Sequence, residues 1–300
     1  MRSPARPLAE PDRARRRGLA ALSLAYAAAL AAALAMAGAL RGRDPLWIAA
    51  WADVAATCTV FLFSAAHDNS SFDDPYWSVA PIPIALYWAS VGGGSLRAAM
   101  VVALVCAWGA RLTGNQLVRW QGAGDEDFRY VELRRRTGRR YWPVSLFTIH
   151  LFPTAWVFLG LLPLYPALAL PARPPGPLDI AAALVAGGGL ALEAVADLQL
   201  RRFLRCRADP AEVLASGVWG RSRHPNYLGE ILFWWGLFLF GLAAAPRWAW
   251  TAVGPLAITA LFLLVSVPWM DRRMLARHPA FAGRLRSTPA LVPWPRRRRA

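Results

Sequence analysis

Long runs of apolar residues without a charged side chain constrain this chain more than any other feature. The run from Leu19 to Leu40 carries no charge, and about 20 apolar residues suffice for a helix to cross the roughly 30 Å hydrocarbon layer of a bilayer. Similar runs lie near 46–66, 78–92, 97–118, 144–165, 178–200, 225–243 and 248–269, of which 78–92 is short. Because helices satisfy their own backbone polar groups in lipid, the sequence predicts an all-α fold, a polytopic transmembrane helical bundle of about eight spans.

The distribution of arginine predicts how this bundle is oriented. The chain has 34 basic residues, all of them arginine. With eight alternating spans and an inner N-terminus, 29 arginines fall on the inner side and five on the outer side, which are Arg41, Arg43, Arg97, Arg173 and Arg247. Cytoplasmic loops of membrane proteins carry the excess of basic residues. Both termini are therefore predicted to be cytoplasmic, and any chemistry is expected on that face.

Composition and motif searches narrow the partners and the domain organisation. The net charge of +16 is explained by attraction to anionic membrane lipid, so no nucleic acid is predicted. No soluble nucleotide-binding motif and no Cys/His spacing for a metal occurs in the sequence. We expect a basic tail at 1–18, a transmembrane domain at 19–270 and a second basic tail at 271–300. The oligomeric state is left open.

The start of the seventh predicted span concentrates polar residues. Pro225 suits the first turn of a helix, where its missing N–H is no loss, so the helix is expected to begin there. Arg223 and His224 then lie beside the positive end of the helix, where phosphate or carboxylate groups bind. Asn226 and Glu230 lie four residues apart on one helix face, with Tyr227 on the adjoining one. An alternative is an interfacial anchor in which arginine and tyrosine meet headgroups and Glu230 pairs locally.

Two other segments carry charge close to predicted spans. Glu193, Asp197 and Arg201 recur at four-residue spacing and share one face of the sixth span. This face either holds a polar cofactor or forms an ion-pair ladder that completes the helix. Asp74 and Tyr76 precede the third span, where a helix cap with an aromatic belt is the alternative to a functional role.

At these residues the chain resembles a known group, the membrane reductases related to steroid 5α-reductase. The resemblance covers residues 73–295 and is closest to the bacterial branch known as domain of unknown function 1295. It rests on several short motifs taken in order. These are Asp74-Pro75-Tyr76-Trp77-Ser78, Trp108-Gly109-Ala110-Arg111-Leu112, Glu126-Asp127-Phe128-Arg129-Tyr130, Glu193-Ala194-Val195-Ala196-Asp197-Leu198-Gln199-Leu200, Ser222-Arg223-His224-Pro225-Asn226-Tyr227-Leu228-Gly229-Glu230, Trp234-Trp235-Gly236, Met270-Asp271-Arg272-Arg273 and Pro293-Trp294.

The resemblance implies NADPH in a cavity open to the cytoplasm of a bacterial inner membrane. Hydride would then pass to a carbon–carbon double bond conjugated to a carbonyl in a lipid-like substrate, such as a steroid, isoprenoid or fatty enone. The catalytic residues implied or considered are Asp74, Tyr76, Tyr227 and Glu230. The cofactor-binding residues are Arg111, Glu193, Asp197, Arg201, Arg223, His224, Asn226, Tyr227 and Asp271.

Two points leave this expectation open. Trp108 stands where the steroid enzymes have the tyrosine that polarises the carbonyl, so steroid reduction is in doubt, and either Tyr76 or Tyr227 could replace that tyrosine. The segment from Arg223 to Tyr227 also resembles isoprenylcysteine carboxyl methyltransferases, which bind S-adenosylmethionine. A membrane methyltransferase is therefore the alternative function, and a non-enzymatic membrane carrier is a remote third.

Overall fold

The computed structural model describes residues 10–120, 122, 124 and 126–292, and throughout these residues the regular structure is helical. Seven helical segments are long and apolar enough to cross a membrane. They are Arg13–Ala39, Pro45–Ala66, Leu96–Val118, Phe128–Leu161, Pro177–Cys206, Pro225–Ala244 and Pro246–Arg277. The all-α prediction is confirmed, and the chain has the helices of an integral membrane protein.

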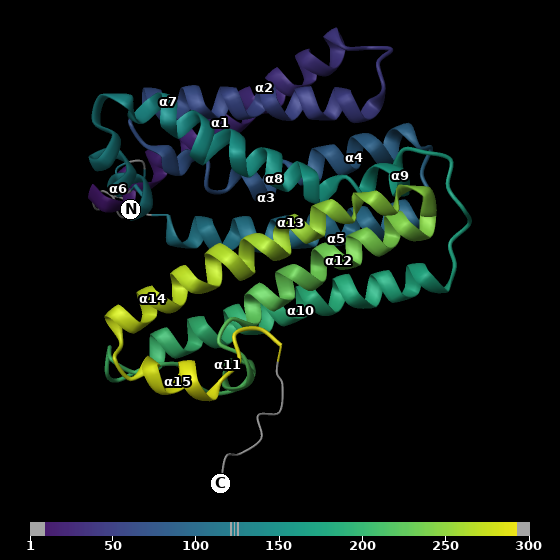
Figure 1. Ribbon diagram of the computed structural model, residues 1–300. Coiled ribbons are helices and arrows are strands. Elements are labelled where there is room, and N and C mark those ends of the chain that lie inside the picture. The colour runs from purple at the N-terminus through teal and green to yellow at the C-terminus, as the bar shows by residue number, and fades with distance from the viewer. Residues whose placement is uncertain (1–9, 121, 123, 125, 293–300) are drawn as a thin grey trace, which may run out of the picture. The chain divides into compact units, whose positions relative to one another are not determined.

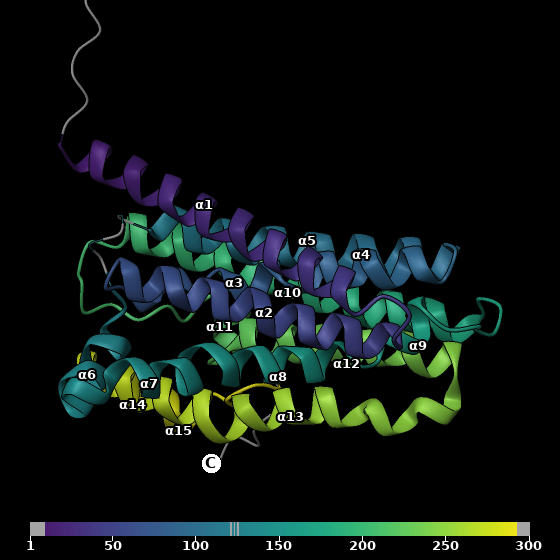
Figure 2. The same ribbon diagram turned by 90° about the horizontal axis from the view of Figure 1, so that it is seen from above.

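The chain divides into two compact units, of which the first comprises Met1–Gly93 and Val105–Phe158. Its helices are α1 (Glu10–Ala39), α2 (Pro45–Ala66), η1 (Ser70–Phe72), α3 (Tyr76–Val79), α4 (Pro81–Val91), most of α5 (Leu96–Arg119), α6 (Phe128–Thr137), η2 (Gly138–Arg140), α7 (Tyr141–Ser145), η3 (Leu146–Leu151) and most of α8 (Phe152–Leu161). Figures 1 and 2 show α1 and α2 running beside each other. Between them lies a core that includes Leu22, Ala56, Val60 and Phe72.

The second unit comprises Gly94–Leu104 and Leu159–Ala300. After the start of α5 and the end of α8, it contains α9 (Leu164–Leu168), α10 (Pro177–Cys206), α11 (Val218–Arg221), α12 (Pro225–Ala244), η4 (Pro246–Ala252), α13 (Val253–Leu261), η5 (Phe262–Ser266), α14 (Val267–Arg277) and α15 (Phe281–Ser287). In Figure 1, α10 and α12 pack along each other. A Cβ atom at Gly189 would lie 2.5 Å from the carbonyl oxygen of Gly229, so small residues permit the close approach, as in many membrane helix pairs.

Prolines explain the helix starts and two irregular stretches. Pro225 is the first residue of α12, as predicted, and Pro45 starts α2 behind an Asp44 side chain that accepts a hydrogen bond from Leu46 N at 2.8 Å. The π-helical stretches η3 and η5 end two residues before Pro153 and Pro268, respectively. Proline lacks an N–H and clashes with the carbonyl four residues earlier, so the helix widens locally instead of breaking.

Three expected segments differ in detail from the prediction. The third expected span, 78–92, corresponds to the four-residue α3 and the 11-residue α4, which makes α4 too short to cross about 30 Å of hydrocarbon. Residues 10–18 of the expected N-terminal tail are helical within α1, and 1–9 lie outside the described residues. In the C-terminal tail, Leu291 packs with Ile231 and Val267, while 293–300, including Pro293-Trp294, also lie outside the described residues.

Candidate functional site

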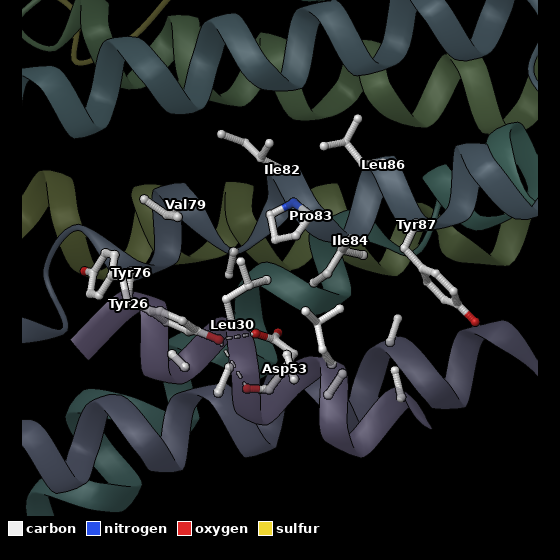
Figure 3. A pocket seen from close by; sticks show the side chains of 18 of the residues that line it. Tyr26, Leu30, Asp53, Tyr76, Val79, Ile82, Pro83, Ile84, Leu86 and Tyr87 are labelled. Carbon is white, nitrogen blue, oxygen red and sulfur yellow. Dashed lines mark hydrogen bonds between the residues drawn. The ribbon is translucent and has the colours of Figure 1, made fainter. Parts of the chain in front are cut away.

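A buried carboxyl and a tyrosine hydroxyl meet in the wall of an apolar cavity in the first unit. Asp53 lies in the middle of α2, and its Oδ1 accepts a 2.7 Å hydrogen bond from the hydroxyl of Tyr76 at the start of α3. The cavity has a volume of about 490 Å³ and is lined by α1, α2, α3 and α4. Figure 3 shows Asp53, Tyr76 and Tyr26 among apolar side chains such as Leu30 and Ile84. The cavity thus presents the hydrogen-bonded pair of Asp53 and Tyr76 within a mainly apolar wall.

Asp74 lies just before Tyr76 and takes different partners. The hydroxyl of Tyr130 donates to its Oδ1 at 2.5 Å, and the Arg129 guanidinium lies 3.8 Å from the same oxygen. Burial raises the pKa of Asp74 to about 6, although the hydrogen bond from Tyr130 opposes the shift. Burial also raises the pKa of the adjacent Asp73, with further contributions from Asp74 and Asp53. Both carboxyl groups before α3 therefore bind a proton at a higher pH than an exposed aspartate does.

In the second unit the structure joins three of the predicted residues through one carboxylate. Asp271 accepts two hydrogen bonds from Arg223, at 3.2 Å from Nε and 2.7 Å from Nη2, and lies 2.9 Å from Nε2 of His224. Arg223 also donates to the carbonyl of Thr288. Burial lowers the pKa of His224, against the effect of Asp271, so at neutral pH the uncharged ring donates its Nε2–H. The Arg223 side chain is 10% exposed and already holds an anion.

The first turns of α12 place the remaining predicted residues on different sides. Oδ1 of Asn226 is buried without a hydrogen-bond partner among the described residues. The Tyr227 ring stacks on His224, with centroids 5.1 Å apart, and contacts Phe262. Glu230 is buried and accepts a 2.9 Å hydrogen bond from Trp234 Nε1. Asn226 Oδ1 therefore has acceptor capacity to offer a ligand.

The predicted face of α10 approaches this part of α12. Glu193 is 1% exposed, and a Cβ atom at Gly229 would lie 2.5 Å from its Cγ. Gly229 lies three residues after Asn226, so the Glu193 side chain lies beside α12 within one helical turn of Asn226. Asp197 is half-buried and Arg201 is exposed further along α10, so the face runs from a buried carboxyl group to an accessible guanidinium.

On α5, in the first unit, Trp108 is fully buried and Arg111 is half-buried one turn later. The indole ring of Trp108 carries no hydroxyl group, so it cannot replace the tyrosine as a hydroxyl donor. No group of three or more His, Cys, Asp or Glu side chains suited to a metal occurs in the part of the chain that the structure describes.

The structure adds functional candidates that the sequence analysis missed. Asp53 and Tyr26 line the cavity with Tyr76, and Tyr130 binds Asp74. Asp53 had a signal in the sequence, because a lone carboxylate in an apolar span is a functional candidate by default. Tyr26 had none, and Tyr130 appeared only within a motif without a role, since their contacts span 46 and 56 residues, respectively.

Comparisons with known proteins identify the family of this chain. Residues 60–286 match a family model described as a protein of unknown function, DUF1295. The chain is 30% identical over 220 residues to an uncharacterized protein of Schizosaccharomyces pombe, an alignment that covers 65% of this chain and 64% of the yeast protein. No solved structure matches the chain significantly. Because the family model spans most of the sequence, this chain is a member of the DUF1295 family.

Proposed function

We propose that this protein is a membrane-embedded, NADPH-dependent reductase. Its substrate would be a lipid-like molecule with a carbon–carbon double bond conjugated to a carbonyl, and its active face would lie toward the cytoplasm of a bacterial inner membrane. The observation that carries the proposal is the Tyr76 hydroxyl, held at 2.7 Å from the Asp53 carboxyl in the wall of an apolar cavity of about 490 Å³.

The chemistry of enone reduction calls for this kind of site. Hydride addition to the double bond develops negative charge on the carbonyl oxygen, and an aimed hydrogen-bond donor stabilises that charge most strongly where water is excluded. Tyr76 can donate to the oxygen, and Asp53 can return the proton to Tyr76. The leucine, isoleucine and alanine side chains of the cavity suit a hydrocarbon substrate and exclude water.

The second unit contains residues that fit a polar cofactor. Asn226 Oδ1 is a buried acceptor without a described partner, and the arginines at the end of α10, Arg201, Arg202 and Arg205, are exposed and suited to phosphate groups. Bound NADPH would supply the hydride. We assign Asn226, Glu193, Asp197 and Arg201 to its binding, and Arg223 to positioning through Asp271 because its guanidinium is already paired. Arg111 remains a prediction from the resemblance to the steroid 5α-reductase group.

The position of Tyr76 bears on which tyrosine acts as donor. Tyr227 stacks between His224 and Phe262, whereas the Tyr76 hydroxyl points at Asp53 beside the cavity. We therefore assign the donor role to Tyr76, in place of the tyrosine that Trp108 replaces. Methylation from S-adenosylmethionine is the second candidate, since it needs only the segment from Arg223 onwards, but it leaves the pair of Asp53 and Tyr76 without a role.

Substitution of Tyr76 by Phe tests the proposal. We expect NADPH oxidation with an enone lipid to fall roughly 10²–10³-fold, the usual cost of one oxyanion donor, with the fold retained because the ring stays. Tyr87→Phe is the matched control, because Tyr87 lines the same cavity without contacting Asp53 in the described hydrogen bonds. Equal rates for Tyr76→Phe, Tyr87→Phe and the unchanged protein would remove Tyr76 from the reaction.

A further inference from the structure

The first unit contains a buried row of polar side chains that the site described above does not use. It lies where α2 and η1 meet the continuous helix α7–η3–α8, and we refer to it as the polar column. Its members are Glu126, Tyr141, Ser70, Ser145, His150 and Ser64. Four of them lie in helical segments long and apolar enough to span a membrane, where polar groups are costly and mark functional paths.

The accessible end of the polar column is Glu126. Its side chain is 12% exposed and lies 3.3 Å from Arg134, which also binds the exposed Asp68. Glu126 accepts a hydrogen bond from the Tyr141 hydroxyl at 3.2 Å, and that hydroxyl lies 2.6 Å from Ser70 Oγ. A partly exposed carboxylate is thus linked through the Tyr141 hydroxyl to the fully buried Ser70.

The interior end is His150, which is fully buried. Ser70 Oγ lies 3.1 Å from Ser145 Oγ, which lies 3.5 Å from Nδ1 of His150. Nδ1 is also 3.1 Å from the Ser145 carbonyl, so it carries a hydrogen in the neutral ring, and Nε2 is 3.1 Å from Ser64 Oγ. With its hydrogen on Nδ1 the ring can only accept at Nε2, so inward transfer requires a change of tautomer that places a hydrogen on Nε2 for delivery to Ser64.

The π-helical stretch η3 keeps the polar side chains of α7, η3 and α8 on the same side of the helix. Tyr141 and Ser145 are four residues apart, His150 follows five residues later across η3, and Thr154 four residues after that. A regular helix would turn the residue at the fifth position about 140° away from Ser145, whereas a π turn brings it back to the same side. Pro153 accounts for the π turn.

Beyond His150 the polar side chains continue toward the cavity. Thr154 lies one turn after His150 and is 2.8 Å from Thr57, and Thr57 lies one turn from Asp53 on α2. Ser64 and Thr57 lie on one side of α2, two turns or about 10 Å apart along its axis. Val60 and Phe61 occupy this interval, so transfer across it requires a transient water molecule.

We propose that the polar column carries protons between the partly exposed Glu126 and the pair of Asp53 and Tyr76, with His150 as the buried carrier. The path serves the reduction proposed above and rests on that function. In the reaction the hydride forms one new C–H bond, the Tyr76 O–H bond breaks to protonate the enolate, and Asp53 reprotonates Tyr76. One proton from water then replaces the one consumed.

The charged groups around this path include the buried Asp73, which interacts electrostatically with Asp53, and Asp68, which binds Arg134. Glu126, Arg134 and Tyr141 face the outer part, and Asp53 and Tyr76 face the inner part. The ring of Phe61 covers one edge of His150 at a centroid distance of 5.2 Å. Proton exchange at His150 is therefore expected to depend on Tyr141 and the serines.

Hydrogen exchange at the His150 ring tests the path without any assay of turnover. Protein labelled with ¹⁵N-histidine in detergent is transferred to D₂O, and loss of the His150 ring N–H signal is followed by NMR, with His150→Gln used for assignment. We expect Tyr141→Phe to slow this exchange at least about tenfold, because a buried group then depends on rare local opening. The exposed Thr148→Val, on the same π turn, should exchange like the unchanged protein. Equal exchange in Tyr141→Phe and the unchanged protein would contradict the path.

Turnover gives the second readout. His150→Gln should lower NADPH-dependent reduction roughly 10²-fold, the usual contribution of a proton-transfer group, and raise the solvent deuterium isotope effect, which a merely structural defect does not do. Unchanged turnover and isotope effect would overturn the role in catalysis. If the unchanged protein reduces no enone, the proposed function fails, while the exchange experiment still decides whether the column conducts protons.

Discussion

Two carboxyl groups in each unit have different kinds of hydrogen-bond partner. In the second unit, Asp179 and Asp271 each bind an arginine through two hydrogen bonds, with Arg97 and Arg223 as the partners. In the first unit, Asp53 and Asp74 are hydrogen-bonded by tyrosine hydroxyl groups. An arginine fixes a carboxylate in its charged form, whereas a hydroxyl partner leaves its protonation open to change. The pairs of Asp179 and Asp271 with arginine thus contribute to stability, whereas Asp53 and Asp74 are able to exchange protons.

The largest effect is expected where an ion pair of the second unit is broken. Arg97 and Asp179 are 2% and 3% exposed, and Arg97 also donates to the carbonyl of Arg173 at 2.8 Å. Arg97→Ala leaves Asp179 buried and unpaired, so the free energy of unfolding should fall by about 3–5 kcal/mol. Denaturation in detergent measures it. The double substitution Arg97→Met with Asp179→Leu should recover much of the loss, and wild-type stability of Arg97→Ala would contradict this view of the second unit.

A smaller effect is expected at Arg223, where the structure sharpens a hypothesis drawn from the sequence. Its position beside a helix start predicts that Arg223→Ala weakens dinucleotide binding by about 1.5–3 kcal/mol. The pairing with Asp271 instead predicts that Arg223→Ala and Asp271→Asn both lower the stability of the apo protein, by a similar amount. Titration of NADPH into both variants separates the two roles. Loss of affinity in Arg223→Ala alone, with stability intact, would restore Arg223 to the phosphate site.

The smallest effect concerns the pH dependence of the first unit. Burial raises the pKa of Asp74 to about 6, so the folded state binds this proton more tightly than the unfolded state does. The resulting stabilisation is complete below about pH 4 and is lost as the pH rises through about 6. Asp74→Asn should therefore flatten the dependence of melting temperature on pH between 4 and 7. Glu212→Gln, an exposed loop variant, should leave the slope unchanged, and an unchanged slope in Asp74→Asn would be evidence against a protonated Asp74.

The sequence predicted what depends on local pattern. Apolar runs located the long helices, and Pro225 located the start of α12, because both signals act within a few residues. Contacts between distant segments were not predictable in this way. The sequence showed no partner for Arg223 nearby, because Asp271, which accepts its hydrogen bonds, lies 48 residues further on. Asp53 and His150 each stood alone in an apolar run, and their partners Tyr76 and Ser64 could not be identified without the packing of α2.

Ligand binding to purified protein in mild detergent tests the central claim most directly. A ligand that binds the folded state raises the melting temperature in proportion to RT ln(1 + [L]/Kd). The proposed reductase predicts that NADPH raises the melting temperature and that S-adenosylmethionine does not. If the Glu230 carboxylate helps to orient the cofactor, Glu230→Gln should fold normally and show a smaller rise in melting temperature with NADPH. A shift with S-adenosylmethionine and none with NADPH would contradict the reductase and favour the methyltransferase.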